Sequence, residues 1–387
     1  MHVGHRSCFN WLWFGVALGS AACTLTHSLD DLRGGIVNGG APGTAGASGS
    51  AESGASELGG SSAGMADAGS AGEAGSPDQL TSPSLVLPAS NGLIGWLSVS
   101  LQFSAALDAT TLSVPVGDSL CAGRSVQISK DDFKTCIEMT AAPVLSKNDT
   151  VATFAPATRL TVGDAYRLRV VNTAKSKDGR AFASTDLDVV AGYSHTVVQT
   201  DSANHFFPEE KLDTSTMGYT LYVAWDASSL YLGMDGQSIS DNMDTTLFLA
   251  YLGAGVGSKM GATFGTHTAS LSFAANAGLA WTGDNQPDKS FSLLSFKGTN
   301  WSSSVQANNA RRNGNFVQFG VPWANLSTSL AALVGTPDAS AQFASGLVSL
   351  TGSDYAMAPK DSLTAKGHYV LDLSGKELPE NALLVTP

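Results

Sequence analysis

The chain has 387 residues and a formal net charge of −12, with 33 acidic against 21 basic side chains. Proteins that bind phosphate backbones need clustered Lys and Arg. The sequence has no such basic patch, which argues against nucleic acid as a partner. Only 14% of the residues are charged, whereas 43% are hydrophobic and Gly occurs 42 times. This composition is typical of secreted β-rich proteins. It also provides enough hydrophobic residues to form a core.

The first 22 residues have the pattern of a secretory signal peptide. His2, His5 and Arg6 precede an apolar run from Phe9 to Ala22 that closes in small residues. Such a run is too short to cross a bilayer comfortably, since about 20 residues are needed. We therefore expect residues 1–22 to be a signal peptide and the protein to be exported.

Cys23 follows directly after Ser20, Ala21 and Ala22. This junction resembles a bacterial lipoprotein signal, although Leu18 lies five rather than three positions before the Cys. The resemblance implies that Cys23 carries a lipid that holds the protein in a membrane, and Thr24 is compatible with the outer membrane. The alternative is ordinary cleavage after Ala22, which would release a secreted protein.

Residues 23–82 are predicted to form a flexible tether. From residue 34 onward Gly, Ala and Ser dominate and no aromatic residue occurs, so the segment cannot bury enough apolar surface to offset its ordering entropy. As a flexible coil of about 50 residues it would reach about 40 Å. It also contains the string GSSAG at 60–64. This string lacks the strand–turn–helix context of a nucleophile elbow, so no catalytic residue is predicted.

Cys121 and Cys136 remain after the signal peptide and Cys23 are set aside. In an oxidising compartment such a pair is expected to form a disulfide. The alternative is two small buried hydrophobic side chains. Their spacing is neither that of a redox motif nor that of a zinc site.

Residues 83–191 alternate short β-patterned runs with turns. In WLSVSLQF, residues 96–103, every second residue is apolar, as in a half-buried strand. The segments LQFSAALDATTL, TVATFAPATRLTVGDAYRLRVV and KDGRAF resemble the S-layer-associated (SbsA-type) bacterial Ig-like domain. The resemblance implies a β-sandwich that acts as a surface spacer or adhesion module.

Residues 192–387 remain β-patterned and become richer in aromatics. The stretch YTLYVAWDASSLYLGMDG, residues 219–236, predicts a hairpin with a turn at Asp226. Alternation sets Trp225 on an apolar face, which we expect to be the core, and Tyr222 and Tyr231 on the opposite face, where they could touch a ligand.

Two further runs, NMDTTLFLAYLG at 242–253 and NGNFVQFGVPWANL at 313–326, follow the hairpin. Together the three elements resemble the DOMON-like β-sandwich superfamily, and most nearly the family 9 carbohydrate-binding modules. The resemblance implies a β-sandwich over about residues 196–373. The superfamily includes sugar binders, haem binders and members of unknown role.

A sugar site requires flat rings for the apolar face of the sugar and polar side chains for its hydroxyls. Loops carry function more often than framework strands do. The candidate ligand-binding residues expected in loops are Trp281, Trp301, Asn308 and Arg311, and Tyr222 and Tyr231 of the hairpin are added to them. The alternative is that Trp281 and Trp301 close the ends of the sandwich.

Other chemistry is weakly indicated, and no cofactor is predicted. Oxygen ligands for calcium could come from Asp241, Asn242 and Asp244 or from Asp284, Asn285 and Asp288, although such clusters are commonly solvated turns. A haem ligated by Met234 and His267 is another option, but no spacing selects that pair.

The sequence therefore predicts an all-β protein with two sandwiches, one Ig-like over residues 83–191 and one resembling a carbohydrate-binding module over residues 192–387. We expect it to be an exported, lipid-anchored, non-enzymatic protein of the cell envelope, with polysaccharide or envelope components as partners. A purely structural or adhesion protein without a small-molecule ligand is the alternative.

Overall fold

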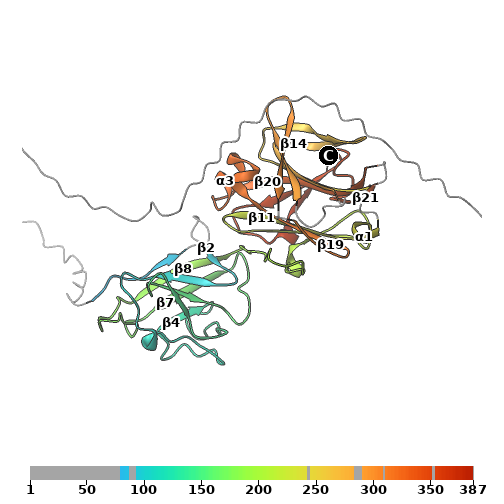
Figure 1. The fold of residues 1–387 in the computed structure, drawn as a ribbon. Helices are drawn as coiled ribbons and strands as arrows, with labels where there is room; N and C mark the ends of the chain where they lie inside the picture. Colours follow the sequence, from blue (N-terminus) through green and yellow to red (C-terminus); the bar gives the residue numbers. More distant parts are fainter. Residues whose placement is uncertain are drawn as a thin grey trace, which may run out of the picture. The chain divides into compact units, whose positions relative to one another are not determined.

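The computed structural model describes residues 79–86, 93–241, 245–282, 290–307, 310–350 and 354–386. Within them the chain forms mostly antiparallel sheets, with one parallel strand pair between β2 (Leu93–Gly95) and β8 (Thr185–Gly192), and a few short helices (Figure 1). The all-β prediction is confirmed. The expected signal peptide, Cys23 and the GSSAG string lie outside the described residues.

Two four-stranded sheets form the N-terminal part. The first has the order β1 (Ser84–Val86), β3 (Val99–Gln102), β6 (Val151–Phe154), β5 (Val144–Ser146). The second has the order β2 (Leu93–Gly95), β8 (Thr185–Gly192), β7 (Ala165–Val170), β4 (Val126–Ser129). A short 3₁₀ helix, η1 (Ala109–Thr111), follows β3.

Alternation along β3 gives this part its core. Val99 and Leu101 are buried while Ser100 and Gln102 between them are half-buried, as the pattern of WLSVSLQF predicts. The rings of Phe103, directly after β3, and Phe182, shortly before β8 of the other sheet, lie 4.9 Å apart between centroids, so residues that follow or precede strands of both sheets pack together.

Ordered pairing begins earlier than the sequence indicates. The N–H of Leu80 donates to the carbonyl of Ala181 at 2.9 Å, and its carbonyl accepts from Ala183 at 2.9 Å. Leu80 also packs against the core. The last residues of the expected tether, which we placed up to residue 82, thus already contact the folded body.

The C-terminal part contains a five-stranded and an eight-stranded sheet. The five-stranded sheet has the order β18 (Ala310–Asn313), β19 (Phe316–Pro322), β11 (Ser229–Asp235), β10 (Thr220–Trp225), β9 (Lys211–Leu212). The eight-stranded sheet has the order β17 (Trp301–Ala307), β16 (Ser290–Phe296), β15 (Ala277–Thr282), β12 (Thr246–Gly253), β20 (Ser340–Ser349), β22 (His368–Asp372), β23 (Leu383–Val385), with β21 (Asp354–Ala358) paired to β20.

A separate hairpin and short helices complete this part. The hairpin consists of β13 (Ser258–Phe264) and β14 (His267–Ala275). The helices are η2 (Pro208–Glu210), α1 (Ser238–Asp241), α2 (Trp323–Leu326), α3 (Thr328–Leu333) and η4 (Pro379–Asn381).

The eight-stranded sheet is covered on both faces. On one face the ring of Phe248 stacks on Phe319 of the five-stranded sheet at 5.1 Å. On the other face Leu249 and Tyr251 share a second core with Phe273 of the β13–β14 hairpin. All eight residues of β12 are therefore buried, which explains why its sequence, TLFLAYLG, is a continuous apolar run rather than an alternating one.

Candidate functional site

The predicted hairpin forms, with Trp225 opposite Leu230. The Asp226 carboxylate Oδ1 accepts hydrogen bonds from the backbone N–H groups of Ser228 at 2.7 Å and Ser229 at 2.8 Å. Its backbone carbonyl accepts from the indole of Trp323 at 3.0 Å. Trp225 is buried, at 2% exposure. The structural role expected for Asp226 and the core position expected for Trp225 are confirmed.

The opposite face of the hairpin is covered as well. Tyr222 is 7% and Tyr231 6% exposed. The ring of Tyr222 lies 5.3 Å from Phe206 and 6.0 Å from Phe316. The segment before β9 thus folds over this face of the five-stranded sheet. Tyr222 and Tyr231, the two hairpin residues named as candidates for ligand contact, thus pack within the fold.

Trp281 lies in a strand rather than in a loop. It sits in β15, opposite Phe248 in the register, and is 1% exposed. Its ring packs against Phe319 of the facing sheet, with 6.0 Å between the ring centroids. This placement corresponds to the alternative in which Trp281 fills the sandwich, because the core covers the whole ring.

Trp301 is the aromatic candidate that reaches the surface. It begins β17 and is half-buried, with Tyr251 at 5.6 Å and Phe296 at 5.5 Å between ring centroids. Its indole N–H donates to the backbone carbonyl of Met260 at 2.6 Å. Because that bond occupies the N–H, further contacts of Trp301 would use its ring.

A groove of about 660 Å³ opens beside Trp301, between β13 and the β16–β17 hairpin. The described residues that line it are all uncharged. They include the hydroxyl or amide side chains of Thr263, Thr268, Thr299 and Asn300 and the ring of Phe264. Sequence patterns did not indicate Thr263 or Phe264, because β13 meets β17 only through the tertiary fold.

Arg311 does not join this groove. Arg311 is half-buried in β18 of the five-stranded sheet, where its Nη1 donates to the carbonyl of Ala310 at 2.8 Å. Asn308 lies outside the described residues. Trp281, Trp301 and Arg311 therefore do not share one exposed cleft.

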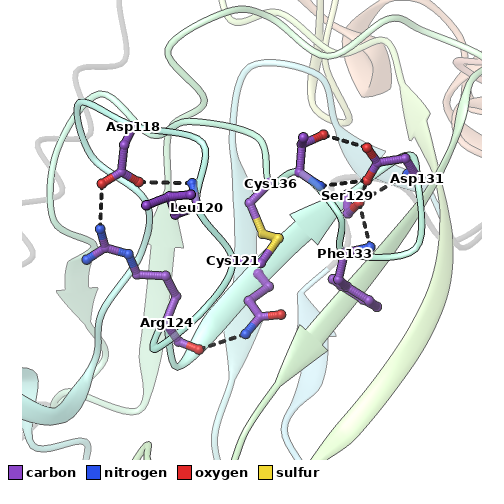
Figure 2. Close-up of a disulfide and its surroundings, with 10 residues drawn as sticks. Asp118, Leu120, Cys121, Arg124, Ser129, Asp131, Phe133 and Cys136 are labelled. Atoms are coloured by element: carbon purple, nitrogen blue, oxygen red, sulfur yellow. Dashed lines mark hydrogen bonds and ion pairs between the residues drawn. A yellow bond between two sulfur atoms is a disulfide. The ribbon is translucent and has the colours of Figure 1, made fainter.

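Cys121 and Cys136 form a disulfide, as the sequence predicts (Figure 2). The loop before Cys136 is held by hydrogen bonds to Ser129 and Asp131, whose side chains lie together in Figure 2. Hydrogen bonds from the side chain and backbone of Thr135 lower the pKa of Asp131 to about 2. The disulfide thus joins two loops that also have polar contacts of their own.

A buried carboxylate that no sequence pattern indicated lies in the segment between β8 and β9. Glu210 is fully buried. Its Oε1 lies 2.6 Å from the hydroxyl of Tyr193 and 2.7 Å from Nδ1 of His195, and its Oε2 accepts from the N–H of Phe207 at 2.8 Å. Burial, with the adjacent carboxylate, raises the pKa of Tyr193 well above its ordinary value. These contacts account for the buried charge structurally.

The residues considered as possible calcium or haem ligands lie partly among the described residues. Of the proposed calcium ligands, Asp241 ends α1, and the other five residues lie outside the described ranges. Among the residues that the structure describes, no group of three or more His, Cys, Asp or Glu side chains could hold a metal ion. In the same ranges, no helix has the length and apolar character needed to cross a membrane. Met234 lies fully buried in the core.

Comparisons with known proteins give only distant similarity. No family model and no curated protein matches the chain. The N-terminal part of the bacterial S-layer protein SbsC aligns at 14% identity over 56% of this chain and 42% of that one, with a TM-score of 0.23. The S-layer protein rSbsC(31-844) aligns at 10% identity over 79% of this chain and 54% of that one, with a TM-score of 0.24.

The chain spans about half the length of these two S-layer structures. TM-scores this low do not establish a shared fold. The Ig-like and carbohydrate-binding-module resemblances read from the sequence remain predictions.

Proposed function

We propose that this chain is an exported, lipid-anchored protein of the cell envelope whose folded body has a structural role. The observation that carries the proposal is the burial of Trp281, Tyr222 and Tyr231, because side chains that could have formed a ligand surface serve the packing of the sheets instead. The disulfide between Cys121 and Cys136 agrees with an oxidising compartment. The signal-like N-terminus and the Gly/Ala/Ser-rich tether agree with export and surface display.

Replacement of the proposed lipid attachment residue tests the anchor. We expect the wild-type chain to incorporate labelled palmitate and to sediment with membranes, and Cys23→Ser to lose both properties. The matched control is Cys8→Ser, which removes a thiol from the expected signal peptide and should leave labelling unchanged. A Cys23→Ser protein that still carries label and stays in the membrane fraction would contradict the anchor.

Carbohydrate binding is a second candidate function, favoured by the groove beside Trp301. The exposed part of an indole ring can pack on the apolar face of a sugar, and the hydroxyl and amide groups around it can bond to sugar hydroxyls. Because the described lining residues carry no charge, the groove suits a neutral sugar. Binding of this kind would attach the body to an envelope polysaccharide.

Tryptophan fluorescence separates the two roles. Apart from Trp301, the described tryptophans are at most 3% exposed: Trp96, Trp225, Trp281 and Trp323. A glycan in the groove should therefore act mainly on the emission of Trp301.

We expect a saturable change on titration of the folded chain with neutral glucan, xylan or chitin oligomers. The change should be absent in Trp301→Ala. It should be retained in Arg311→Ala, because Arg311 does not line the groove. Absence of any change with these glycans would remove the second candidate and leave the structural role.

A further inference from the structure

Strand β17 ends the eight-stranded sheet with an open edge. Among the strands of the described residues its one neighbour is β16, and the pairing runs without a register shift from Phe296 opposite Trp301 to Ser290 opposite Ala307. In such an edge strand, alternate backbone N–H and C=O groups point away from the sheet. β17 therefore presents a regular row of hydrogen-bonding groups seven residues long.

Edge strands are normally protected from pairing with other chains by charge, proline, bulges or short length. Other edge strands of the C-terminal part have at least one of these protective features. β18 carries Arg311 and Arg312, β9 has two residues including Lys211, β23 has three residues, and β13 pairs with β14 through register shifts. β17, with the sequence WSSSVQA, has no charge, no proline and no bulge.

The edge is also accessible. Ser302, Ser303 and Ser304 are exposed, and Val305 is 72% exposed. Small side chains on an edge allow another backbone to approach closely. An exposed Val within a row of Ser residues adds apolar area that such an approach would bury.

Charge favours a second copy of this chain as the occupant. The protein carries a net charge of −12, so two copies repel each other through most of their surface. Residues 299–310 contain no charged side chain. A two-fold contact brings each surface patch against its own copy, so an uncharged patch is where two acidic copies can meet at the lowest electrostatic cost.

We propose that β17 pairs antiparallel with β17 of a second copy, which joins the two eight-stranded sheets edge to edge. A two-fold axis at the middle of the strand sets Ser304 opposite Ser304 and Ser303 opposite Val305. A single strand pair buries less than the ~1,000 Å² of a stable interface, so the dimer is weak in solution. Copies held on one membrane by the proposed lipid would dimerise more readily, because anchoring raises their effective concentration; the pairing itself does not depend on the anchor.

Cysteine cross-linking tests the register of the pair. The background is the mature chain with Cys23→Ser, in which Cys121 and Cys136 are already bonded to each other. Under oxidising conditions Ser304→Cys should form a covalent dimer, because only the central residue meets its own copy. Ser303→Cys should not cross-link to itself but should do so when mixed with Val305→Cys. Ser146→Cys, an exposed residue on the three-residue edge strand β5, is the matched control.

Sedimentation equilibrium tests the pairing without cysteines. Val305→Lys places two like charges in the contact and should raise the dimer dissociation constant at least about tenfold. Met217→Lys adds the same charge at a 99% exposed site and should change nothing.

Three results would each overturn the proposal. The first is a chain that stays monomeric at its highest soluble concentration. The second is a dimer that Val305→Lys leaves unchanged. The third is Ser304→Cys cross-linking no greater than that of Ser146→Cys.

Discussion

The hydroxyl of Tyr231 donates a hydrogen bond to the carboxylate of Asp226, with 2.9 Å between the two oxygens. Asp226 begins the hairpin turn and Tyr231 lies on the returning strand, so one carboxylate holds both the turn and the strand. Although burial alone would raise the pKa of Asp226, hydrogen bonds from Thr196 and Ser228 outweigh it and lower the pKa. The most polar part of the hairpin thus supports the fold.

Removal of the Asp226 carboxylate should lower the stability of the fold substantially. Asp226→Ala leaves the Tyr231 hydroxyl and two backbone N–H groups without their acceptor, and we expect the free energy of unfolding to fall by about 2–3 kcal/mol. Tyr231→Phe removes one hydrogen bond and should cost about 1 kcal/mol. Denaturant titration measures both changes. Equal effects of the two substitutions would show that Asp226 does not hold the turn.

The stability of the protein should fall at alkaline pH partly through Tyr231. Burial, followed by the negative charge of Asp226, raises the pKa of Tyr231 to about 12. An unfolded tyrosine ionises near pH 10. Below about pH 10 the phenol is protonated in both states and its contribution is complete; between about pH 10 and 12 the unfolded state loses its proton first, so stability declines as the pH rises.

Unfolding free energies measured across this range should decline less steeply for Tyr231→Phe than for the wild type. The difference between the two proteins isolates Tyr231 from the other buried tyrosines. Identical pH profiles would place the Tyr231 phenol in contact with water in the folded state.

Glu210 should contribute more to stability than its neighbour Glu209. Glu210→Ala leaves the Tyr193 hydroxyl, His195 and the N–H of Phe207 without a buried acceptor, and we expect a loss of about 3 kcal/mol. Glu209 forms a partly exposed ion pair with Arg159 at 2.9 Å. For Glu209→Ala we expect a loss of about 0–1 kcal/mol. Thermal and urea unfolding of the two variants provide the comparison, and similar losses would contradict it.

Loss of the disulfide should destabilise the N-terminal part. The bridge joins residues 15 positions apart, and a loop of this length contributes about 3 kcal/mol in the chain-entropy estimate. The double variant Cys121→Ser, Cys136→Ser should lose about that amount in a denaturant titration. Reduced wild-type protein should behave like the variant, and reduction that leaves its stability unchanged would refute the contribution.

The two tryptophans proposed for ligand binding should differ in what they do for the fold. Trp281→Ala empties a fully buried position and should cost about 3–5 kcal/mol. Trp301→Ala removes a half-buried ring and should cost clearly less. Calorimetric melting temperatures of the two variants test this, and a Trp301 variant as unstable as the Trp281 variant would assign Trp301 to the core.

Local patterns in the sequence were sufficient for several elements. Alternating residues predicted β3, and the turn at Asp226 predicted the hairpin formed by β10 and β11. Trp281 shows where the pattern failed. Strand alternation does not include it, which favours a loop, yet β15 runs from Ala277 through Thr282.

By itself the sequence determined the all-β class and the turn at Asp226, because each depends on residues close together in the chain. It also favoured a bond between Cys121 and Cys136, the two cysteines left after the signal peptide and Cys23, and the structure contains that bond. The tertiary structure decided which strand faces are covered. Alternation divides a strand into two faces but does not say what packs on them: Phe206 covers Tyr222, and the β13–β14 hairpin covers the outer face of β12. Whether an aromatic side chain is core or surface depends on such distant segments, and for that reason only the fold separated Trp301 from Trp281.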